Sequence, residues 1–147
     1  MAATAWTLFD KAKRKIGNGT IKLGVDIFAV QLHTSASNIS TSTLSLAGSV
    51  NNQVAAGNGY TTGGRTLASV TWTVGASAAQ YRFDAADPIW TATGGDINSI
   101  KFALLRNSAG GSAQAVAWSR LTANQFNLTS GNTLTLVLNA NGIFTMV

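Results

Sequence analysis

The chain has 147 residues, enough for one domain with a single core, and its ten Lys and Arg against five Asp give a formal net charge of +5. It contains no Cys, no Glu and a single His, which excludes disulfides, thiolate metal sites, Cys nucleophiles and multi-His metal centres. Because this inventory is thin for acid–base chemistry, the composition predicts a protein that is not an enzyme and has no cofactor.

Residues 4–16 repeat apolar side chains at spacings of four, three and four, which predicts a short amphipathic helix. Gly17 ends this pattern, and a two-residue period follows it. The chain therefore divides into an N-terminal helical arm, residues 1–18, and a body, residues 19–147. The apolar positions of the predicted helix are Ala5, Phe9, Ala12 and Ile16.

The arm and the residues just after it hold most of the positive charge. Residues 1–22 contain five basic residues and one Asp, a sum of +4, and the rest of the chain contains five basic residues and four Asp, a sum of +1. Such a segment can bind nucleic acid, an acidic lipid surface or an acidic protein patch, or it can be a solvated helix face. We expect the arm to leave the body and contact an acidic partner surface through Phe9, Lys11, Lys13, Arg14, Lys15 and Ile16.

Two further classes of partner are not predicted. No apolar run approaches the roughly 20 residues of a membrane span, so we expect no membrane partner. Basic and aromatic residues do not alternate along any predicted strand, so nucleic acid is not an expected partner either.

The body reads as a series of short strands separated by turns. Apolar and other residues alternate over residues 20–29, which predicts a long strand, and His33 follows in a position that indicates a surface residue. The connection Asn107–Ser112 is rich in Gly and Ser and predicts a hairpin between its flanking strands. Seven or eight short strands are typical of a mainly β fold, a single antiparallel β-sandwich of jelly-roll type. The later strands are predicted at residues 67–74, 80–84, 89–92, 99–106, 113–118, 133–138 and 143–147.

Several patterns invite a functional interpretation, and each has a structural alternative. Asp84 and Asp87 can offer oxygens to Ca²⁺, but two carboxylates are too few for a full site, and a turn before Pro88 is favoured. Glycines at 57, 59 and 63 miss the spacing of a dinucleotide loop. Four Trp can stack on sugars, although their apolar contexts favour the core or a subunit interface. They are Trp6, Trp72, Trp90 and Trp118.

From residue 54 to the end, four segments carry a resemblance to a known kind of protein. Ile21-Lys22-Leu23 after the predicted helix also fits it. Together they resemble the small β-sandwich structural proteins of tailed bacteriophage virions. The four segments are Gly59-Tyr60-Thr61-Thr62-Gly63-Gly64 with Leu67, Tyr81-Arg82-Phe83-Asp84-Ala85-Ala86-Asp87 running to Trp90, Lys101-Phe102-Ala103-Leu104-Leu105-Arg106, and Asn141-Gly142-Ile143-Phe144.

The resemblance implies a role in the virion and no chemistry. The role expected from it is capsid decoration, also called cement, in which a homotrimer at the capsid surface bridges subunits of the major capsid protein. A tail or neck component of the phage particle is the alternative within this class. A carbohydrate-binding module that uses exposed Trp side chains is the alternative from another class.

Overall fold

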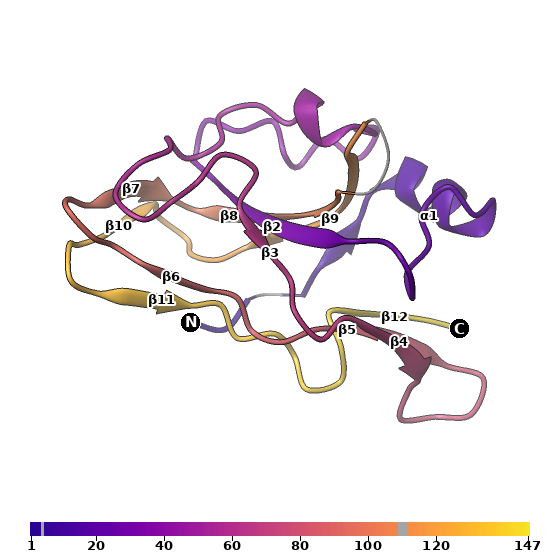
Figure 1. Ribbon diagram of the computed structural model, residues 1–147. Helices are drawn as coiled ribbons and strands as arrows, with labels where there is room; N and C mark the ends of the chain where they lie inside the picture. The colour runs from indigo at the N-terminus through magenta and orange to yellow at the C-terminus, as the bar shows by residue number, and fades with distance from the viewer. Residues whose placement is uncertain (4, 109–111) are drawn as a thin grey trace.

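The structure is a computed structural model that describes residues 1–3, 5–108 and 112–147. It contains one α-helix, α1 (Asp10–Gly17), and one short 3-10 helix, η1 (Ala47–Ser49), among its described residues. The remaining elements are strands (Figure 1). They are β1 (Thr7–Leu8), β2 (Phe28–His33), β3 (Arg65–Thr66), β4 (Thr71–Val74), β5 (Tyr81–Asp84), β6 (Ile89–Thr91), β7 (Ile97–Ile100), β8 (Phe102–Asn107), β9 (Gln114–Arg120), β10 (Phe126–Leu128), β11 (Thr133–Thr135) and β12 (Phe144–Met146).

The strands form antiparallel sheets that pack as a sandwich, which confirms the predicted fold class. A five-stranded sheet has the order β1-β9-β8-β2-β3, and a three-stranded sheet has the order β12-β5-β4. The pairs β11-β6 and β10-β7 form two smaller sheets. Figure 1 shows β2, β8 and β9 in one layer, with β6, β11, β5 and β12 in the layer beneath it.

Aromatic side chains join the two layers. The ring centroids of Phe28 in β2 and Phe83 in β5 lie 4.8 Å apart in an edge-to-face arrangement. Phe83 also stacks on Phe144 of β12, with a centroid separation of 5.2 Å. All three side chains are buried. The core of the protein therefore lies between these layers.

Strand β2 is buried along its whole length, on both faces of the sheet. The other layer covers one face, and residues from the long connection between β2 and β3 reach the core as well. Tyr60 from this connection carries a structural contact, because its Oη accepts the Leu32 N–H at 2.9 Å and the Gln53 side-chain amide at 2.8 Å. Strand β3 pairs only with Ala29 and Val30 of β2. Beyond the end of β3, the Tyr60 hydroxyl accepts the backbone N–H of Leu32 in place of a neighbouring strand.

The predicted hairpin is present. Strands β8 and β9 pair antiparallel over their length, with a register shift between Leu105 and Arg106. Residues 109–111 of the predicted Asn107–Ser112 connection lie outside the described residues. Strand β6 begins at Ile89, directly after Pro88, as the sequence predicts.

The prediction of a long strand over residues 20–29 is wrong. The chain turns before Phe28, and the backbone N–H groups of Val25 and Asp26 both donate to the Lys22 carbonyl. The Asp26 carboxylate then accepts the Lys22 N–H at 2.8 Å, which closes the turn. Alternation of apolar residues does not distinguish this compact turn from a strand, and Val25 is 79 % exposed.

The N-terminal segment also differs from its prediction. The helix begins at Asp10, because Thr7 and Leu8 are already committed to strand β1 beside β9. Thr4, within the predicted helix, lies outside the described residues. Before it, the N-terminal ammonium donates to the Thr135 carbonyl at 2.8 Å. The segment expected to leave the body is thus folded onto it, with β1 paired to β9 in the five-stranded sheet.

Candidate binding surface

The six residues predicted to contact a partner divide into an inner and an outer set. Phe9 is fully buried in the core, and Ile16 is half-buried against it. These two apolar side chains stabilise the protein itself, so they do not form a free apolar anchor. Folding of β1 onto β9 is the cause, since it places Phe9 between the layers.

Lys15 also points inward. Its Nζ donates to Ser45 Oγ at 2.6 Å and to the side-chain oxygen of Gln114 in β9. Burial, followed by the nearby charges of Arg14 and Lys11, lowers the pKa of Lys15. Lys15 therefore attaches α1 to the body.

The outer set remains exposed on α1. It consists of Lys11, Lys13 and Arg14, which we call the basic face. Lys13 Nζ lies 3.5 Å from a carboxylate oxygen of Asp10, and both side chains are largely exposed. Because an exposed pair of this kind contributes about 0–1 kcal/mol, Lys13 can exchange Asp10 for a partner at little cost.

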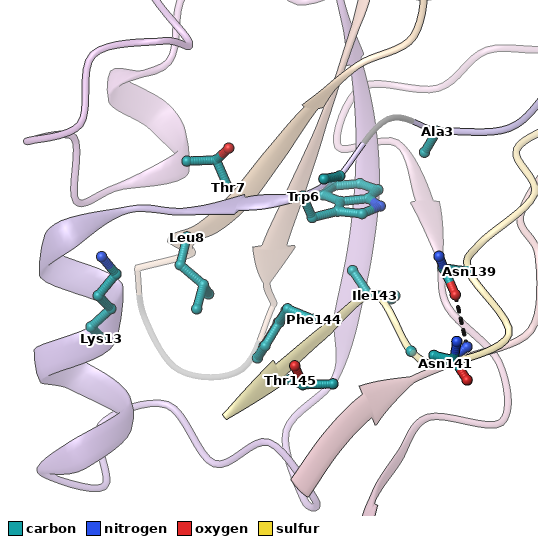
Figure 2. Close-up of a pocket in the computed structure, with 12 residues that line it drawn as sticks. Ala3, Trp6, Thr7, Leu8, Lys13, Asn139, Asn141, Ile143, Phe144 and Thr145 are labelled. Atoms are coloured by element: carbon teal, nitrogen blue, oxygen red, sulfur yellow. Dashed lines mark hydrogen bonds between the residues drawn. The ribbon is translucent and has the colours of Figure 1, made fainter. Parts of the chain in front are cut away.

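An open groove of about 550 Å³ lies beside the basic face, between the edges of the two layers (Figure 2). Trp6 and Leu8 line it from the side of β1, and Ile143 and Phe144 line it from the side of β12. We call it the edge groove. Lys13 stands at one end of it in Figure 2.

The opposite end of the edge groove is polar. Asn139 and Asn141 lie there, and the Asn139 side-chain oxygen accepts the Asn141 backbone N–H at 2.8 Å. Trp6 places its indole Nε1 out of contact with solvent and without a hydrogen-bond partner among the described residues. A buried indole N–H usually has an acceptor, so the Trp6 N–H is an unsatisfied hydrogen-bond donor at the groove.

The carboxylates are occupied by structural contacts. Asp84 accepts the Ala85 N–H at 2.9 Å, which supports the turn interpretation over a Ca²⁺ site. Asp87 accepts the Leu138 N–H at 2.8 Å, and Asp96 accepts the Ser130 N–H at 2.9 Å. Among the described residues no three His or Asp side chains gather as metal ligands.

The single histidine is buried, which corrects its predicted surface position. His33 lies in β2, and its Nδ1 donates to the Asn51 carbonyl at 2.9 Å. Burial lowers the pKa of His33, although the hydrogen bond to Asn51 opposes this effect. The connection after β2 folds back over this position, and no short-range pattern indicates that.

The buried state of His33 predicts a pH dependence of stability. The unfolded chain takes up a proton near the ordinary pKa of about 6.5, and the folded protein resists it. Stability is therefore complete above that pH and falls as the pH drops below it. We expect the free energy of unfolding, measured by urea titration, to fall between about pH 7 and pH 5.5 in the natural protein. The variant His33→Gln should show a flatter profile, and equal slopes would contradict the assignment.

The four Trp side chains belong to the core or pack against it. Trp90 is buried, and the other three are half-buried against the core cluster. Trp72 stacks on Tyr81 with ring centroids 5.6 Å apart, so one face of each ring is already covered. No two Trp rings pair as an exposed platform among the described residues. This arrangement favours the structural interpretation of the Trp residues over stacking on sugars.

Comparisons with known proteins add no relative. No family model, no curated protein and no solved structure matches the chain. The only helices among the described residues are short, and neither has the length and apolar character to cross a membrane. The fold and the surface therefore define the protein as an antiparallel β-sandwich with a cationic helix and an open groove at one edge.

Proposed function

We propose that this protein is a non-enzymatic structural protein of a tailed bacteriophage virion, which decorates the capsid and bridges subunits of the major capsid protein. The observation that carries the proposal is the placement of charge on a rigid sandwich. Three exposed cations lie within one turn of α1, one of them, Lys13, lines an open groove, and four of the five Asp carboxylates accept backbone N–H groups. This arrangement suits attachment to an acidic protein surface.

The sequence segments behind the phage resemblance support the same proposal through their structural roles. Tyr60 holds β2, Phe83 joins the two layers, and Phe144 stacks on Phe83. These segments thus build the sandwich, and a shared sandwich is what the resemblance implies. In the proposed role a homotrimer sits on the shell, where many weak contacts add up through avidity.

The two alternatives differ in what supports them. A tail or neck component would have the same fold and the same basic face, so only its position in the particle distinguishes it. A carbohydrate-binding module is disfavoured, because Trp90 is buried and Trp72 is covered on one face by Tyr81.

The test combines position and charge. An electron-microscopy map of the intact particle is expected to show the protein on the outer capsid surface. In a rebinding assay on particles that lack the protein, the variant Lys11→Ala/Lys13→Ala/Arg14→Ala should lose at least about tenfold in occupancy. Each exposed ion pair contributes at most about 1 kcal/mol, so three together account for such a loss. Binding of the natural protein should weaken as salt rises, because screening shortens the range of the attraction.

A matched control removes the same number of charges elsewhere, as Lys22→Ala/Arg65→Ala/Lys101→Ala, and should retain occupancy. Equal losses in the two triple variants would show that only net charge matters and would remove the basic face from the proposal. If the map placed the protein in the tail or neck, capsid decoration would be ruled out in favour of a tail or neck component.

A further inference from the structure

We propose that the edge groove binds an extended, acidic polypeptide segment of a partner protein, which adds as a strand beside β1. This inference goes beyond the proposed function, since it holds for any partner that offers such a segment. It assigns a binding mode to the groove and a chemical class to its occupant.

The first argument is the hydrogen-bonding pattern of β1. Strand β1 is the end strand of its sheet, with β9 on one side only. The Phe9 N–H donates to the Val116 carbonyl at 3.0 Å, and Thr7 pairs with Trp118 in the same register. Because facing groups alternate along an antiparallel ladder, Leu8 directs its N–H and C=O away from β9. These groups are available to a further strand.

The second argument is the second open edge across the groove. Strand β12 ends the order β12-β5-β4, so it also has a neighbour on one side only. Figure 2 shows Leu8 from β1 and Phe144 from β12 projecting into the same space. An extended segment presents alternate side chains to opposite faces, so every second side chain can enter this apolar space.

The third argument is the unpartnered donor at Trp6. Its Nε1 is buried, and no acceptor among the described residues reaches it. Trp6 lines the edge groove together with Leu8. An occupant can reach this N–H only when the Trp6 side chain turns toward the groove, and a backbone carbonyl or a carboxylate of an added segment would then pair a donor that is otherwise unsatisfied.

Charge identifies the chemistry of the occupant. Among the described residues the groove is lined by one charged side chain, Lys13, whose Nζ lies 3.5 Å from the Asp10 carboxylate outside the lining. Lys11 and Arg14 are exposed on the same helix and add to its positive charge, but neither of them lines the groove. An acidic segment is therefore complementary to this end of the groove, and a basic segment is repelled.

A second copy of this chain is a poor source of that segment. Four of its five Asp carboxylates accept backbone N–H groups, and the fifth, Asp10, pairs with Lys13. None of its segments combines an exposed extended backbone with several free carboxylates among the described residues. A partner protein is the occupant that the charges favour.

The test begins with a selection from a library of random ten-residue peptides against the whole protein. Selected peptides are expected to be enriched in Asp and Glu. The most enriched peptide, synthesised with a fluorophore, then serves as the probe. Its binding to Lys13→Glu should weaken at least tenfold, and its binding to Trp6→Phe, which keeps a ring but loses the N–H, should weaken several-fold.

The matched control is Arg65→Glu, the same change of charge in β3 at the opposite edge of the sheet, and it should bind within twofold of the natural protein. Strand addition itself is read by amide hydrogen exchange, in which the Leu8 N–H should exchange more slowly with the probe bound. Selection without acidic enrichment, equal effects of the Lys13 and Arg65 variants, or unchanged exchange at Leu8 would each overturn the proposal. So would light scattering that shows self-association lost in Lys13→Glu and retained in Arg65→Glu, because a second copy would then fill the groove.

Discussion

Replacement of Gly64 by Ala is expected to cost the protein about 3 kcal/mol or more of its free energy of unfolding. A Cβ at this position would lie 2.0 Å from the Val30 carbonyl oxygen and 2.6 Å from its carbon. Val30 belongs to β2, which is buried along its length and cannot move aside without disturbing the core. Gly64 also has φ +79°, a conformation that is strained for Ala. Urea unfolding monitored by Trp fluorescence measures the loss.

Two other glycines separate the causes. Gly131 has φ +87° and open space around it, so Gly131→Ala reports the backbone strain alone, about 1–2 kcal/mol. Gly17 has neither a positive φ nor a neighbour within 4 Å, and it ends α1, so Gly17→Ala should be neutral or slightly stabilising. If Gly64→Ala cost no more than Gly131→Ala, close approach to Val30 would not be the reason for glycine there.

The close approach explains a motif that the sequence alone leaves open. Gly59 shows the same geometry as Gly64, with φ +93° and a Cβ position 2.1 Å from the Thr91 carbonyl oxygen. Between them Tyr60 inserts its phenol beside Leu32, and burial raises the pKa of Tyr60, so the hydroxyl keeps its proton. Residues 59–64 thus pack the long connection between β2 and β3 against both layers of the sandwich. Close approach to neighbouring carbonyls accounts for Gly59 and Gly64, and the spacing of the glycines does not match that of a nucleotide loop.

Local periodicity predicts much of the fold, because a two-residue period records which face of a strand is buried. Phe83 between half-buried neighbours in β5 and Leu134 in β11 follow this rule. The rule fails at residues 20–29, where Ile21 and Leu23 are buried by a turn that Asp26 closes. It also fails at His33, since the connection that buries it comes later in the chain.

Less of the candidate binding surface than of the fold could be predicted from the sequence. The sequence shows that α1 carries several cations, but it does not show which of them are exposed. Lys15 is held against the body because its Nζ donates to Gln114, 99 residues away, whereas Lys13 stays exposed. The edge groove joins β1 to β12, which lie at opposite ends of the chain. The order of the strands in the two sheets brings β1 and β12 to the same edge of the sandwich. Neither segment has a sequence pattern that predicts this proximity.

Replacement of Phe9 by Ala is the second change with a large expected effect, a loss of about 3–5 kcal/mol in the free energy of unfolding. Phe9 is fully buried in the core cluster and directly precedes α1. Its backbone N–H donates to Val116 in β9, so the main chain holds the residue while the truncated side chain leaves a cavity. Thermal and urea unfolding of the purified variant measure the loss.

The comparison with two neighbours decides whether the N-terminal segment is an arm or part of the sandwich. Ile16→Ala removes a half-buried side chain and should cost less than Phe9→Ala, and Lys11→Ala removes an exposed one and should change stability by less than about 0.5 kcal/mol. A segment that leaves the body would make all three variants equal in stability, because none of the side chains would then be buried in the free protein. A graded series would show instead that the segment is part of the sandwich, so that Phe9 is available to a partner only at the expense of the fold.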